Sequence, residues 1–358
     1  MTAPSGSPLH VRGVRLLFVA ASLVVVVAGL KAAQSFFLPL LMALFLTILC
    51  IPPMRWLERR GLPTWLAALL VIAGAILAVL AVAVVIGGSL QSFYLELPFY
   101  RARLDGMVQT ALSWLSGHGI DISVQELTAD INTGAVMDLV GAIASSLVSA
   151  FSTVVLVLLL MAFMLVELNG APRKIRLALG DPDADISDLG RGADMVQRYL
   201  AVKTIMGLLN AVIATGICFA FGIDFALLWG LFAFLFNFVP NVGSVLAGIP
   251  PVLLGLIQYG PARAALVAAL YILLDFTTAN WLEPRMMGRR LGLSPLVVML
   301  SLVFWGWLWG PIGMLLSVPL TSATKLFCEH TDDMRWLAIL LGTGDEPPAR
   351  PGDTVPPA

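Results

Sequence analysis

Asp275 is the residue whose type and position most directly suggest chemistry. It is the only acidic residue well inside an apolar run, eleven residues after Ala264. A carboxylate at that depth in a bilayer costs a few kcal/mol unless it is protonated, paired or hydrated. Burial favours the neutral form of a carboxyl group, so Asp275 is a candidate site for a proton or a cation. The alternative is a structural ion pair or a hydrogen bond to a neighbouring helix.

Two more polar residues follow in the same segment. Asn280 and Glu283 are three residues apart, so they share a face if the helix continues. Both are candidates for a substrate or ion path. Glu283 is expected at the membrane interface, where it either takes part in gating or pairs with a nearby arginine. The neighbouring arginines are Arg285, Arg289 and Arg290.

Polar groups also flank a break in the preceding apolar run. Amide and hydroxyl groups there can bind a polar solute or line a cation path, and they can equally satisfy the backbone groups freed by a proline. Glycine at such a break allows a sharp turn or close approach of helices. The candidate residues are Asn237, Pro240, Asn241, Gly243 and Ser244.

A second long apolar run, near the C-terminus, is interrupted in the same way. Each break has a proline, a glycine two or three residues later and a further proline beyond it. Non-helical backbone at membrane depth is tolerated only where protein or a water-filled cavity satisfies it, and paired broken segments indicate a transport site. Either run could instead be a kinked helix that crosses once. The second break contains Gly310, Pro311, Gly313 and Pro319.

The composition is that of an integral membrane protein. The chain is 59% hydrophobic and 12% charged, against roughly 25% charged in a soluble domain. A net charge of −1 gives no indication of a nucleic-acid partner. The sequence shows no metal-type spacing of cysteine or histidine, no phosphate-binding loop and no intramembrane nucleophile–base pair. We therefore predict no cofactor, no metal site and no enzymatic activity.

The uncharged runs predict an all-α, polytopic protein with six to eight membrane segments. Basic residues between these runs place the N-terminus in the cytoplasm and the acidic 90–140 segment outside. The 226–258 run then begins and ends outside, as a re-entrant hairpin would, and the 296–327 run begins inside. The candidate segments are 14–30, 36–51, 64–89, 141–166, 204–221, 226–258, 264–281 and 296–327.

Four regions follow from this pattern. Residues 1–89 are N-terminal transmembrane helices, and residues 90–140 form an amphipathic helical arm outside the membrane. Residues 141–340 form the transport region, with a cytoplasmic helical segment at 167–203. Residues 341–358, which are rich in proline, are expected to be a disordered tail.

The chain also resembles a known family, most specifically in its C-terminal part. The run that begins Asn280-Trp-Leu-Glu-Pro-Arg, the run Trp305-Gly-Trp-Leu-Trp-Gly-Pro-Ile-Gly and the run Asn237-Phe-Val-Pro-Asn-Val-Gly are similar to the autoinducer-2 exporter family of bacterial membrane proteins. The likeness covers about residues 14–340. It implies a multi-pass inner-membrane protein that exports small molecules and forms a homo-oligomer, with a pentamer as one possible state. Many relatives have Tyr-Ile-Gly-Pro after the first proline, where this chain has Asn241-Val-Gly-Ser, so the substrate could differ.

Three functions remain open on the sequence alone. The first is a secondary transporter for a small solute related to autoinducer-2, coupled to protons or sodium. The second is a sodium or lithium/proton antiporter with no organic solute. The third is a membrane scaffold, in which the 90–140 arm binds partner proteins and nothing is transported.

Overall fold

The computed structural model contains helices and turns, and no strand, over the residues it describes. The expected arm beyond residue 117 and the tail from residue 343 lie outside these residues, as does Asn241. The described residues are 21–117, 153–168, 170–178, 180, 187–240, 242–287, 292–329, 331 and 334–342.

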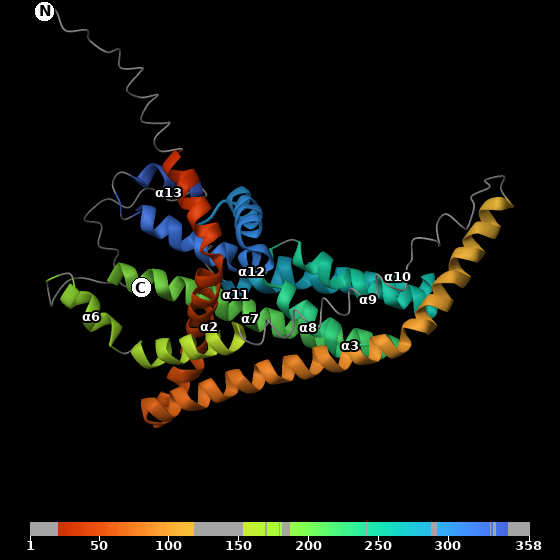
Figure 1. The fold of residues 1–358 in the computed structure, drawn as a ribbon, viewed down its shortest axis with the longest axis horizontal. Coiled ribbons are helices and arrows are strands. Elements are labelled where there is room, and N and C mark those ends of the chain that lie inside the picture. The colour runs from red at the N-terminus through yellow and green to blue at the C-terminus, as the bar shows by residue number, and fades with distance from the viewer. Residues whose placement is uncertain are drawn as a thin grey trace, which may run out of the picture.

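Figure 1 shows the described helices, coloured in chain order from α2 to α13. Two of them, Ala21–Ala32 and Thr153–Glu167, are named by their residues. The labelled elements are α2 (Gln34–Arg59), α3 (Thr64–Ser116), α6 (Ala171–Ala178), α7 (Ser187–Phe221), α8 (Ala226–Phe236), α9 (Gly243–Tyr259), α10 (Pro261–Thr277), η1 (Thr278–Leu282), α11 (Glu283–Met287), α12 (Pro295–Glu329) and α13 (Arg335–Leu341).

Five of the described helices are long and apolar enough to cross a membrane, which confirms the predicted polytopic all-α class. The longest, α3, has 53 residues and therefore extends for about 80 Å, more than twice the thickness of the hydrocarbon core. It runs without interruption past residue 90, where the composition changes. The five are Gln34–Arg59, Thr64–Met107, Asp194–Phe221, Pro261–Met286 and Pro295–Glu329.

The first broken run folds as a helical hairpin of α8 and α9. Asp224, just before α8, accepts a hydrogen bond from Gln258 in the last turn of α9, so the two open ends of the hairpin lie together. At the other end, the side chain of Asn237 bonds to the backbone oxygen of Lys203 in α7, 2.9 Å away. The segment thus begins and ends at the C-terminal end of α7 and turns near the middle of that helix.

The second broken run is also a hairpin, contained within α12. Trp309 and Gly310 have non-helical dihedrals, and Gly310 has φ of 65°, which suits glycine best. The indole of Trp305 donates a hydrogen bond of 3.1 Å to the hydroxyl of Thr321. Sixteen residues of straight α-helix would separate these two by about 24 Å, so the chain must fold back at Gly310.

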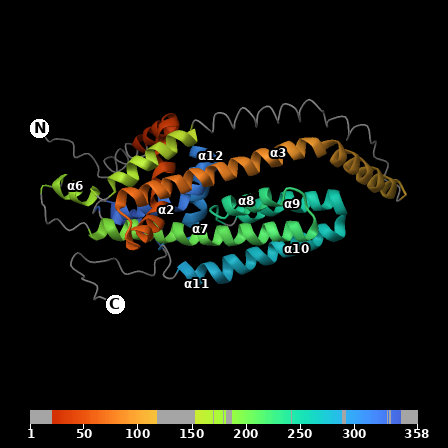
Figure 2. The ribbon, with the colours of Figure 1, turned by 90° about the horizontal axis from the view of Figure 1, so that it is seen from below.

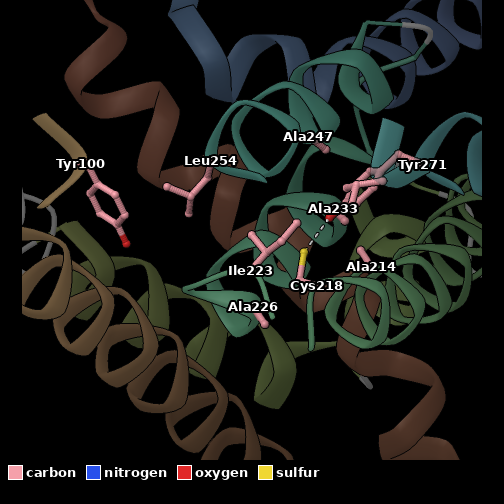
Figure 3. Packing of buried hydrophobic residues seen from close by; sticks show 10 residues of the cluster. Tyr100, Ala214, Cys218, Ile223, Ala226, Ala233, Ala247, Leu254 and Tyr271 are labelled. Carbon is pink, nitrogen blue, oxygen red and sulfur yellow. Dashed lines mark hydrogen bonds between the residues drawn. The ribbon is translucent and has the colours of Figure 1, made fainter. Parts of the chain in front are cut away.

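The α8–α9 hairpin lies between α3 on one side and α7 and α10 on the other (Figure 2). Its apolar side chains form a buried cluster with residues from all these helices, including Cys218, Leu254 and Tyr271 (Figure 3). The sulfur of Cys218 lies 3.4 Å from the hydroxyl of Tyr271 within that cluster. This packing holds the hairpin against α10, the helix that carries Asp275.

Candidate functional site

A cavity of about 320 Å³ lies where α7, the turn of the α8–α9 hairpin and the α10–α11 segment meet. Small-molecule sites have volumes of roughly 300–1,000 Å³, so this one suits a small ligand. Several predicted site residues line it, drawn from two segments more than 30 positions apart in the chain. They are Asn237, Pro240, Ser244, Asp275, Asn280 and Glu283.

Asp275 contributes the one acidic side chain on α10 to the cavity wall. It is half-buried, and no hydrogen bond or ion pair joins its carboxylate to another described residue. The hydroxyl of nearby Thr278 is directed at backbone oxygens of its own helix, with Leu274 O at 2.8 Å. Among the described residues, the Asp275 carboxylate thus has no partner, and it lies in the cavity wall.

A buried ion pair closes one side of the cavity. Lys203 Nζ of α7 lies 2.6 Å from Glu283 Oε1 of α11, and the two side chains are only 8% and 17% exposed. The hydroxyl of Tyr199, one helical turn before Lys203, is buried and has no hydrogen-bond partner among the described residues. Removing one member of such a pair leaves a buried charge without compensation, so both members are needed to hold α7 and α11 together.

Glu283 therefore pairs with a lysine 80 positions away, and among the described residues it does not pair with Arg285. The guanidinium of Arg285 instead stacks on Trp281, with its central carbon 4.1 Å from the ring centre. Arg289 and Arg290 lie outside the residues that the structure describes. The pair makes Glu283 a contact between two helices as well as part of the cavity wall.

A π-helical turn, η1, separates Asp275 from Glu283. It widens the helix at Thr278–Leu282, and such turns occur often at functional sites. The amide of Asn280, inside this turn, donates to Phe276 O at 3.1 Å. The α-helical register expected between Asn280 and Glu283 is thus interrupted, although both residues line the cavity.

The turn of the first hairpin is tied to α7 by two amides. Asn210 Nδ2 donates to Asn237 Oδ1 at 3.1 Å, and Asn237 Nδ2 donates to Lys203 O. The side-chain oxygen of Asn210, Oδ1, is buried and has no hydrogen-bond partner among the described residues. Gly243 packs so closely that a Cβ there would lie 1.8 Å from Phe236 O. These contacts fix the turn at the cavity.

The second break lies elsewhere. Of the described residues, those that line the cavity belong to α7 through α11, and α12 contributes none of them. Gly310, Pro311, Gly313 and Pro319 therefore shape the α12 hairpin and do not contact a solute in this cavity. In that hairpin a Cβ at Gly313 would lie 2.0 Å from Trp305 O.

Sequence reasoning missed two residues of the site, Lys203 and Asn210. A signal for each was available. Asn210 is the one amide within the uncharged 204–221 run, and Lys203 is the last cation before that run begins. Neither residue lies near a proline break, so the break pattern predicted no role in the site for either.

Comparison with known proteins gives one consistent result. A family model described as AI-2E family transporter matches residues 20–333. YhhT of Escherichia coli (strain K12) is 38% identical over 340 residues, which cover 95% of this chain and 97% of that protein. The AI-2 transport protein TqsA of the same strain is 37% identical over 333 residues, with 93% and 97% covered. A Haemophilus influenzae protein is 33% identical over 334 residues, with 92% and 96% covered.

Proposed function

Because this chain belongs to the AI-2E family of transporters, we propose that it exports a small polar solute across the bacterial inner membrane by secondary active transport. A proton or a sodium ion supplies the driving force. The observation that carries this proposal is the unpaired Asp275 carboxylate in a cavity of about 320 Å³. A carboxylate with no protein partner at membrane depth is an expected feature of an ion-coupled site.

The solute proposed first is a small hydroxylated molecule like autoinducer-2. One relative is an AI-2 transport protein, and the cavity offers amide and hydroxyl groups suited to a polar ligand. The amides come from Asn210 and Asn237, and the hydroxyls from Ser244 and Thr278. Polar groups that converge on a cavity fix the orientation of a small ligand there.

Coupling follows from the charges at the cavity. Lys203 and Glu283 neutralise each other, which leaves Asp275 as the uncompensated charge of the described wall. Binding of a proton or a sodium ion at Asp275 removes that charge and lowers the cost of moving the site across the membrane. With the N-terminus in the cytoplasm, the Lys203–Glu283 pair lies toward the cytoplasmic side and acts there as a gate.

A second candidate function is sodium or lithium/proton antiport without an organic solute. It is favoured by the same observation, because one carboxylate can bind a proton and a cation in alternation. In either case we propose a homo-oligomer, with a pentamer as the first state to test by native mass spectrometry.

The test uses the full-length protein in liposomes loaded with autoinducer-2, under an imposed pH or sodium gradient. We expect solute flux that depends on the gradient, and Asp275→Asn should reduce that flux at least tenfold with folding retained. Asp105→Asn, an exposed carboxylate on α3, is the matched control and should transport like the wild type.

Three other results would change the proposal. Cation-driven proton movement without solute flux would establish antiport in its place. Wild-type coupling in Asp275→Asn would remove this residue from the mechanism. The absence of any flux from well-folded protein would point to the scaffold hypothesis.

A further inference from the structure

Four polar side chains meet at the open end of the α8–α9 hairpin, away from the cavity. Tyr100 Oη lies 2.7 Å from Glu96 Oε2 on the same helix and 2.7 Å from Asp224 Oδ2 in the turn before α8. The amide nitrogen of Gln258, in α9, donates to Asp224 Oδ2 and lies 3.4 Å from Tyr100 Oη. We call these four residues, Glu96, Tyr100, Asp224 and Gln258, the arm cluster.

The arm cluster is separate from the cavity. Lys203, at the cavity, and Phe221, at the end of α7 next to the cluster, are about 27 Å apart along the helix axis. Tyr100 is only 3% exposed and Gln258 8%. Figure 3 shows the Tyr100 ring at the edge of the apolar cluster that contains Ile223 and Leu254. These polar groups are thus partly shielded from water.

No described cation pairs with either carboxylate of the arm cluster. The charged groups near it are Arg101 and Arg103 on α3 and Arg263 on α10, while α8 and α9 contribute none. Arg103 reaches the backbone oxygen of Gln258 at 3.5 Å, and Arg263 lies over the ring of Tyr259. Glu96 and Asp224 therefore lie on either side of one hydroxyl, and neither forms a salt bridge with a cation in the described part of the chain.

The hydrogen bonds at Tyr100 require more protons than its hydroxyl carries. Both contacts have the length of a normal O–H···O bond, and each such bond needs one proton between its oxygens. A tyrosine hydroxyl donates one proton and otherwise accepts. The second contact is therefore complete only when Glu96 or Asp224 carries a proton of its own. Two ionised carboxylates would leave two oxygen atoms facing each other without a proton.

Gln258 gives independent evidence that the arm cluster has too few hydrogen-bond donors. Its side chain points into the cluster through Nε2, yet its Oε1 is buried and has no donor among the described residues. Buried acceptors without a donor are rare in folded proteins and call for an explanation such as a missing ligand. The cluster as a whole thus offers more acceptors than donors.

We propose that the arm cluster binds one proton, shared through Tyr100 between Glu96 and Asp224, and that this proton latches the arm helix α3 to the α8–α9 hairpin. With the proton bound, α3, the α7–α8 turn and α9 are joined by continuous hydrogen bonds. As pH rises and the proton leaves, two carboxylates compete for one hydroxyl and repel each other, so the contact opens. This site does not rest on the proposed solute or on Asp275.

The experiment measures the distance between α3 and α9 without any transport. Spin labels are attached at Leu95 and Leu253, which are exposed, after replacement of Cys50, Cys218 and Cys328 by alanine. Double electron–electron resonance in lipid nanodiscs then follows pH from about 4 to about 9, which spans ordinary carboxyl titration. We expect a narrow distance distribution at low pH and a broad or longer one at high pH.

Variants distinguish opening caused by proton loss at the arm cluster from general effects of pH. Glu96→Gln keeps a neutral donor at the same place, so the distribution should stay narrow at every pH. Tyr100→Phe removes the bridge, so the distribution should be broad at every pH, and Asp105→Asn should behave like the wild type. Gel filtration verifies that each variant is folded, and Asp224→Asn repeats the Glu96→Gln test from the other side.

Two outcomes would overturn the proposal. One is a wild-type distribution that does not change with pH, or that changes equally in Glu96→Gln and Asp224→Asn. The other is an opening that follows replacement of choline by sodium at constant pH, because the occupant would then be a metal cation and not a proton.

Discussion

The two hairpins of this transporter have similar backbones and different surroundings. Each turns at a proline–glycine break, and each places a glycine so close to an earlier carbonyl that a side chain cannot fit. The α8–α9 turn is surrounded by amides and an ion pair and lines a cavity, whereas the α12 turn is held by tryptophans. The backbone motif therefore specifies a shape, and the neighbouring helices decide whether that shape forms a site.

The tryptophans of the α12 turn show how neighbouring residues hold a hairpin that does not line the cavity. Trp309 is buried and donates to Leu30 O at 3.3 Å, which ties the α12 turn to an N-terminal helix. Trp305 spans the hairpin to Thr321. These contacts satisfy polar groups within an apolar setting, and the cation near the turn, Lys31, lies over the ring of Trp307 with its Nζ 4.2 Å from the ring centre. By contrast, the first hairpin meets Asp275, Lys203 and Glu283.

The glycine substitutions should have the largest effect and should affect both hairpins alike. Gly243→Ala and Gly313→Ala each place a Cβ within 2.0 Å of a backbone oxygen, so the turn must open. We expect a loss on the order of 5 kcal/mol in the free energy of unfolding. Thermal unfolding in detergent measures it. Gly216→Ala, with nothing within 4 Å, is the control. Wild-type stability of either variant would show that its turn is not as the structure has it.

Breaking ion pairs should distinguish the two hairpins. Glu283→Gln leaves Lys203 buried and uncompensated, for an expected cost of about 3–5 kcal/mol. The matched change near the end of α12 is Glu329→Gln, whose carboxylate is 42% exposed and lies 3.3 Å from Lys325. It should cost under about 1 kcal/mol. Denaturant unfolding compares the two variants, and equal losses would contradict the difference in burial.

The smallest stability effects should come from single hydrogen bonds, and here transport distinguishes the hairpins. Asn237→Ala removes two bonds at the cavity and should cost about 1–3 kcal/mol and lower solute flux severalfold. Thr321→Val removes the bond from Trp305 and should cost about 1 kcal/mol without changing flux per folded molecule. Flux measured in liposomes at matched protein content is the readout. A lower flux in Thr321→Val would bring α12 into the transport step.

The hairpins could be predicted because prolines, glycines and uncharged runs are local signals, and the charges between the runs limit where each segment can end. The length of α3 could not, since the composition change near residue 90 marks where the apolar stretch ends and not where the helix ends. No local pattern in the sequence predicted the π-helical turn at Thr278–Leu282. The Lys203–Glu283 pair depends on packing between distant helices, while arginines adjacent in sequence offered simpler partners.

The pairing of Lys203 with Glu283 also has an electrical consequence. A neutral pair feels no net force from the membrane potential, but a lone carboxylate at Asp275 does, at about 2.3 kcal/mol per elementary charge per 100 mV. A step that moves Asp275 across the field as an anion is therefore driven or opposed by voltage. In the proposed cycle, the same step with a proton or sodium ion bound at Asp275 would be electrically silent, so the voltage dependence of each half of that cycle would report which form of Asp275 moves.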